Sequence, residues 1–109
     1  MLRGIKSSIK KWKEVKANII KKNEGIHYHN TYWCSCGYCN VFSCSECPMH
    51  DIDKEHNIIG YKKKNAIYCD IAFAAISLAD SKDWRNALVC VNIVLDKMNK
   101  DLYDYSPII

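Results

Sequence analysis

The sequence predicts a mainly α-helical fold: a small three-helix domain with a cysteine-rich loop organised by a metal ion. Three observations predict it. Apolar side chains recur at helical spacing in three separate segments of the chain. The 109 residues include only four glycines and two prolines, which disfavours a β-sandwich or a turn-rich secreted scaffold. Five of the seven cysteines fall within residues 34–47. At this length we expect one domain spanning residues 1–109.

The first predicted element is an amphipathic helix over residues 4–22, inside a basic segment of residues 1–25. Residues 1–22 contain eight lysines and arginines and one acid, whereas the remaining residues contain eight basic and eleven acidic ones. The apolar side chains fall on one stripe, with Val15 beside it: Leu2, Ile5, Ile9, Trp12 and Ile19. A second face carries four cations, called the basic row below: Arg3, Lys6, Lys10 and Lys13. Asn23 to Gly25 predict the C-terminal end of this helix.

Residues 26–50 show neither helical nor strand periodicity and contain two Cys-x2-Cys pairs, Cys36/Cys39 and Cys44/Cys47. Such a turn places two thiolates on one side of a tight loop, where they can share one tetrahedral metal ion. Only four residues separate the pairs, which makes a wholly local site cramped. We therefore expect Cys69, in the first turn of the second helix, to complete the site, because the helix dipole favours a thiolate there. Cys34 is a spare ligand.

The predicted metal is Zn²⁺, the usual ion of closed thiolate sites. An iron–sulfur cluster is the alternative, since Cys47-Pro48 is similar to the end of the bacterial ferredoxin run, although the spacings differ. A histidine can replace a cysteine ligand, and the sequence offers four: His27, His29, His50 and His56. Cys90 lies in an apolar helical setting and is predicted to be a core residue.

The connector of residues 51–64 is polar and ends in Lys62, Lys63 and Lys64. A helical hairpin is predicted over residues 65–100, with helices at 65–80 and 82–100 joined by a tight turn at residues 80–82. Asn65 and Ser81 are the expected N-caps. The helix over 65–80 is apolar on two faces, so it is expected to form the centre of the domain. Residues 101–109 are expected to be a loosely packed tail.

No signal peptide or membrane-spanning segment is expected, because charges interrupt every long apolar run. We therefore expect a cytoplasmic location, in which the thiols stay reduced and clustered cysteines indicate a metal rather than disulfides.

The segment Cys36-Gly-Tyr-Cys39, followed by Cys44-Ser-Glu-Cys47-Pro48-Met49 and the later Cys69, resembles small bacteriophage and prophage proteins. The resemblance covers about residues 8–100, including Lys-Lys-Trp-Lys-Glu-Val at residues 10–15. It implies a metal-organised helical protein located in the host cytoplasm, with those five cysteines at the matching positions. It implies no reaction.

The function expected from these features is binding without catalysis, because the sequence contains no nucleotide-binding loop and no arrangement typical of an active site. The expected partner is a host protein, occluded by a regulator or by an inhibitor of a defence system. The aromatic side chains of the cysteine-rich segment are candidate anchors or else core residues: Tyr28, Tyr32, Trp33, Tyr38 and Phe42.

Two other functions stay open. The basic row, with Lys21, Lys22 and Lys62–Lys64, can follow a nucleic-acid backbone or form a solvated face. A redox role through an iron–sulfur cluster or a dithiol is the second alternative. The sequence predicts no oligomeric state.

Overall fold

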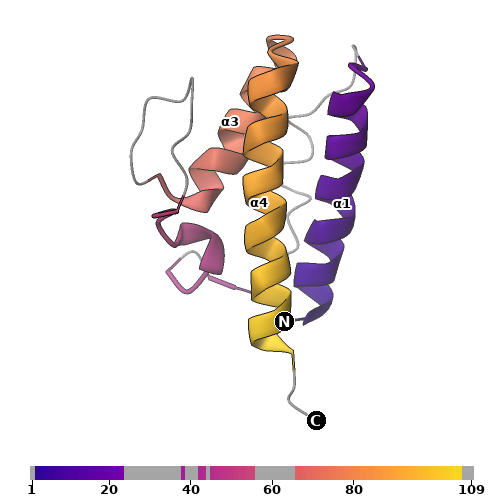
Figure 1. Ribbon diagram of the computed structural model, residues 1–109. Coiled ribbons are helices and arrows are strands. Elements are labelled where there is room, and N and C mark those ends of the chain that lie inside the picture. Colours follow the sequence, from indigo (N-terminus) through magenta and orange to yellow (C-terminus); the bar gives the residue numbers. More distant parts are fainter. Residues whose placement is uncertain (1, 24–37, 39–41, 44, 56–65, 107–109) are drawn as a thin grey trace.

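The computed structural model describes residues 2–23, 38, 42, 43, 45–55 and 66–106. Its elements are α1 (Leu2–Ile20), the short 3-10 helix η2 (Pro48–His50), α3 (Tyr68–Asp80) and α4 (Trp84–Tyr105) (Figure 1). Among the described residues there is no strand, and Ile52 and Ile67 form one isolated antiparallel bridge. The prediction of a mainly helical, three-helix fold is confirmed.

Helix α4 occupies the centre of the bundle, with α1 and α3 packed against it (Figure 1). The prediction that the helix over 65–80 is central is therefore wrong. The reason is length: the 22 residues of α4 extend about 33 Å, whereas the 13 residues of α3 extend about 20 Å. Of the three α-helices described, only α4 is long enough to pack along the 19 residues of α1 and also to pack against α3.

Apart from Leu2, which is partly exposed, the apolar stripe predicted for α1 is buried in the core, including Trp12, which is 2% exposed. Helix α4 contributes buried side chains over most of its length, and Cys90 among them is fully buried, as predicted. These buried α4 residues include Ala87, Cys90, Val91, Ile93, Val94, Leu95 and Met98. The core therefore runs along the full axis of α4.

Two helices end in the same way, with a lysine in the left-handed conformation. Lys22 has φ 52° after α1, and Lys82 has φ 63° after α3. In each case two backbone bonds of the Schellman pattern follow, for example from the Asp83 amide to the Leu78 carbonyl at 2.9 Å. The turn at Lys82 reverses the chain and forms the predicted hairpin.

The predicted caps are wrong at both helices of the hairpin. Asp83, not Ser81, caps α4 by accepting a hydrogen bond from the Asn86 amide. Ile67 occupies the N-cap position of α3 and provides no side-chain cap, because its side chain has no polar atom; its backbone is engaged with Ile52 in the extended bridge. Asn65 lies outside the described residues and outside α3.

The described end of the chain is more ordered than predicted. Helix α4 continues to Tyr105, so the expected tail over 101–109 is wrong for its first five residues. The extension is stabilised by Asp101, which is 2% exposed, and by Leu102, which packs against the core.

Candidate functional site

Two of the predicted metal ligands, Cys47 and Cys69, flank one junction of the fold. Cys47 directly precedes η2, and η2 packs against α3, in whose first turn Cys69 lies. Cys47 is 9% exposed, and Cys69 is partly buried against the core. Both are thiols rather than disulfide partners.

Backbone pairing fixes this junction. The Tyr68 amide donates to the Asp51 carbonyl at 3.1 Å, and the Asp53 amide donates to the Ala66 carbonyl at 2.9 Å. Together with the bridge between Ile52 and Ile67, these bonds hold the chain after η2 along the chain that enters α3. Cys47 and Cys69, distant in sequence, therefore belong to two segments that this backbone pairing joins.

The other candidate ligands, Cys34, Cys36, Cys39 and Cys44, lie outside the described residues. Among the residues that the structure describes, no group of three or more His, Cys, Asp or Glu side chains is arranged to hold a metal ion. The choice among the six predicted thiols thus remains a prediction.

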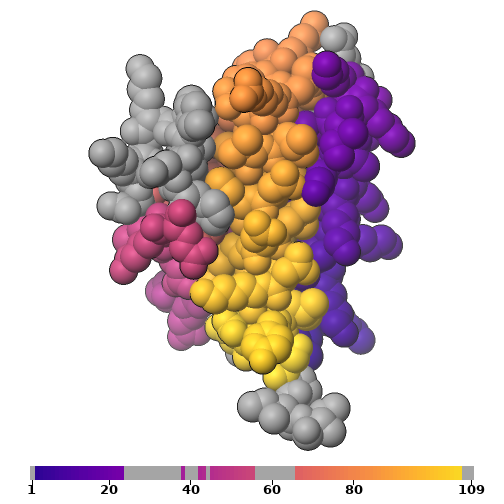
Figure 2. All heavy atoms as spheres, viewed as in Figure 1, coloured from indigo at the N-terminus to yellow at the C-terminus, as the bar shows by residue number. Residues whose placement is uncertain are grey.

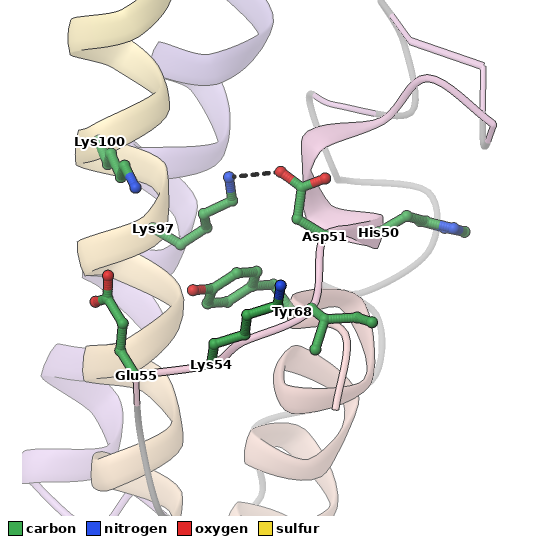
Figure 3. A pocket seen from close by; sticks show the side chains of 8 residues that line it. His50, Asp51, Lys54, Glu55, Tyr68, Lys97 and Lys100 are labelled. Carbon is green, nitrogen blue, oxygen red and sulfur yellow. Dashed lines mark hydrogen bonds and ion pairs between the residues drawn. The ribbon is translucent and has the colours of Figure 1, made fainter. Parts of the chain in front are cut away.

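A partly buried polar network on α4 holds the chain at Tyr38, inside the first Cys-x2-Cys pair, and at Asp51, after the second pair. Asp101 accepts hydrogen bonds from the Tyr38 hydroxyl at 2.9 Å and from Lys97 Nζ at 2.7 Å. Lys97 Nζ also donates to Asp51 at 3.2 Å (Figure 3). Tyr38 stands between Cys36 and Cys39 in the sequence, and Asp51 follows Cys47 by four residues. One i,i+4 pair on α4 therefore anchors the chain at two points, one inside the first Cys-x2-Cys pair and one after the second.

The Lys97 ammonium remains charged in this network. Burial lowers the pKa of Lys97, but the hydrogen bonds and charges of Asp101 and Asp51 outweigh burial, so the pKa is raised above 10.5. The ammonium also lies 5.3 Å from the centre of the Tyr68 ring, a cation–π distance. Its donors are thus directed at two carboxylates and one aromatic face.

Tyr68 joins this network to the α3 junction. Its hydroxyl donates to Asp53 Oδ1 at 3.4 Å, and Asp53 is 2% exposed. Burial, followed by the negative charge of Asp53, raises the pKa of Tyr68 to about 12. The phenol therefore stays protonated and acts as a structural donor rather than as an acid at neutral pH.

A pocket of about 550 Å³ opens above Tyr68 and Lys97, between η2, the start of α3 and α4 (Figure 3). Its described lining mixes both signs of charge and contains no cysteine or serine nucleophile: His50, Asp51, Ile52, Lys54, Glu55, Tyr68, Lys97 and Lys100. Since Lys97 is already paired with carboxylates, the pocket is best explained as the solvent-facing side of the polar network.

The predicted aromatic anchors divide into two groups. Tyr38 is fully buried, and Phe42 stacks on it with ring centres 5.8 Å apart and forms a T-shaped pair with Tyr105, with ring centres 5.6 Å apart. For these two residues the structure therefore favours a core role, and Tyr38 as a surface binding residue is wrong because its hydroxyl and ring are enclosed. Tyr28, Tyr32 and Trp33 lie outside the described residues, as do Lys62, Lys63 and Lys64.

The basic row is exposed along its whole length. Arg3, Lys6, Lys10 and Lys13 all face solvent, and none forms an ion pair with a described residue. The opposite stripe of α1 is buried from Ile5 to Ile19, so this stripe is not available to a membrane surface. No described helix combines the length and apolar character required to cross a bilayer.

The α4 network is the feature that sequence reasoning missed. Lys97 and Asp101 flank Met98 at i,i+4 spacing and continue the apolar stripe, which is an unusual place for two charges. That pattern was the available signal, but the partners Tyr38 and Asp51 are set by tertiary structure. Comparisons with models of protein families, with curated proteins and with solved structures find no match to this chain.

Proposed function

We propose that this protein is a small, non-enzymatic zinc-binding protein that acts by binding and covering a surface of a host macromolecule. One zinc ion would tie the cysteine-rich segment to the first turn of α3, through four of Cys36, Cys39, Cys44, Cys47 and Cys69. A closed thiolate site of this kind stabilises a fold and leaves no open position for a substrate. The resemblance to phage proteins supports a host protein as the partner.

The observation that carries the proposal is the junction that Cys47 and Cys69 flank. A local site made from the two Cys-x2-Cys pairs alone would not need Cys69 to lie beside the chain that leaves the cysteine-rich segment. The pairing of residues 51–53 with 66–68 holds the chain that follows Cys47 and η2 along the chain that enters α3, which supports a site bridging the two segments.

The α4 network supports a binding role for the segment. Because Tyr38 and Asp51 are both anchored to the Lys97–Asp101 pair, the segment between them begins and ends at fixed points. Fixing two points of a chain lowers the conformational entropy that it loses when it binds a partner, which supports a binding role for this segment.

The test is elemental analysis of protein purified without chelator and without oxygen, for the wild type and for matched cysteine variants. We expect about one zinc per chain and a colourless protein. Cys69→Ser should weaken metal retention against a competing chelator and lower the unfolding temperature. Cys90→Ala removes a buried thiol of the core and serves as the control, with metal retention unchanged.

A brown protein with broad visible absorption would replace zinc by an iron–sulfur cluster. Absence of both metals would refute the proposal, and equal metal affinity in the Cys69 and Cys90 variants would assign the site to the cysteine-rich segment alone. For the binding role, a host protein retained by the wild type and by Cys90→Ala, but lost with Cys47→Ser/Cys69→Ser, is the expected result.

A further inference from the structure

We propose that the basic row of α1 is a docking surface for a nucleic-acid backbone, which it binds through the phosphates without reading the base sequence. The inference does not rest on the zinc site, because the row lies on α1 and is held by the contact of α1 with α4. It adds a second ligand class to the proposed function.

The geometry of the row suits a chain of phosphates. Arg3, Lys6, Lys10 and Lys13 follow one another by steps of three and four residues along one exposed face, about 15 Å from first to last. Each strand of B-form DNA carries one phosphate charge per about 3.4 Å of helix axis, so a row of this length passes about four charges of one strand when it runs along the duplex axis. Figure 2 shows side chains of α1 projecting from the outer edge of the molecule, away from α4.

The charges of the row are available to a partner. None of the four cations forms an ion pair with a described residue, and Glu14, the only acid of α1, is not paired with them. Residues 23–109 carry more acids than bases, so the net positive charge of the chain comes from the segment containing α1. Such a charge asymmetry orients the molecule toward a polyanion during encounter.

Three features favour a nucleic-acid backbone over an acidic protein or a membrane. The row contains no exposed aromatic anchor of the kind that provides most of the energy of protein interfaces. The apolar stripe of α1, including Trp12, is buried against the core and cannot enter a bilayer. Three of the four cations are lysines, which bind phosphates as point charges, whereas base recognition relies on arginine.

The test is fluorescence anisotropy of a labelled 20-base-pair DNA duplex titrated with the full-length protein at 50 to 200 mM NaCl. Four neutralised phosphates predict a slope of about −3.5 for log affinity against log salt, which is roughly a 100-fold loss over this range. A duplex of unrelated sequence should bind equally well, within about twofold.

The decisive variant is Lys6→Gln/Lys10→Gln/Lys13→Gln. It should lower the affinity at 50 mM NaCl at least about tenfold and reduce the salt slope by about three, with circular dichroism and thermal unfolding unchanged. The matched control is Lys54→Gln/Lys100→Gln, which removes exposed lysines of the pocket and should change affinity less than about twofold.

Absence of salt-dependent binding by the wild type would overturn the proposal, as would equal losses in the two variants. A poly-glutamate peptide of matched charge that binds more tightly than the duplex would assign the row to an acidic protein instead. These outcomes are independent of metal content, so failure of the zinc proposal and failure of this one are distinguishable.

Discussion

Lysines of α1 and Lys97 of α4 have the same chemistry and opposite roles. Lys6, Lys10 and Lys13 face solvent without a described ion-pair partner, whereas the Lys97 side chain is 9% exposed and binds two carboxylates. A buried cation must be paired in the folded state, so Lys97 specifies how distant segments meet. An exposed and unpaired cation adds little to stability and remains available to a ligand.

The largest expected difference between the two regions is in stability. Asp101→Ala leaves Lys97 without its closer carboxylate and the Tyr38 hydroxyl without its acceptor, so we expect a loss of about 3–5 kcal/mol in the free energy of unfolding. Denaturant unfolding monitored by circular dichroism measures it. Lys10→Gln is the control and should change stability by less than about 0.5 kcal/mol. Similar values for the two variants would remove the distinction drawn between α4 and α1.

Alkaline pH should lower the free energy of unfolding through the buried groups of α4. Burial, with a smaller contribution from Asp83, raises the pKa of Cys90 from 9.0 to about 11. The folded state therefore keeps a proton that the unfolded chain releases, and this contribution is present below pH 9 and lost as pH rises through 11. One group shifted by this amount contributes about 2–3 kcal/mol. Tyr68 and Lys97, whose pKa values are also raised, act in the same direction at higher pH.

The measurement is denaturant unfolding under reducing conditions between pH 8 and 11. The wild type should lose stability faster with pH than Cys90→Ala, which lacks the thiol. Parallel pH profiles for the two proteins would show that the buried thiol does not contribute.

The smallest expected change in stability comes from removing the Tyr38 hydroxyl. Tyr38→Phe removes the hydroxyl but keeps the ring on Phe42, and Asp101 retains Lys97, so we expect a loss of about 1.5 kcal/mol. Urea unfolding of the single variants and of Tyr38→Phe combined with Lys97→Met gives the coupling between the two hydrogen bonds to Asp101. Additive effects would mean that Tyr38 and Lys97 are independent anchors.

Sequence periodicity was sufficient to predict the helices, because the spacing of apolar residues indicates which face of a helix is buried. The stripe of α1 and the turn before α4 follow from the positions of Trp12 and Lys82 and their neighbours. The central position of α4 could not be predicted, because it depends on which helix is long enough to contact both others. The Tyr38–Asp101 bond joins residues 63 positions apart, and no local pattern encodes such a pairing.

The position of α4 at the centre also has a kinetic consequence. Helix α1 precedes α3 and α4 in the sequence, yet its main packing partner among the described helices is α4, so its stripe lacks that partner until α4 has been synthesised. Contacts this distant in sequence slow folding relative to a bundle in which neighbouring helices pair. During synthesis the stripe around Trp12 is an exposed apolar surface that a chaperone can bind, and the α3–α4 hairpin has the sequence-local contacts needed to form before α1 docks.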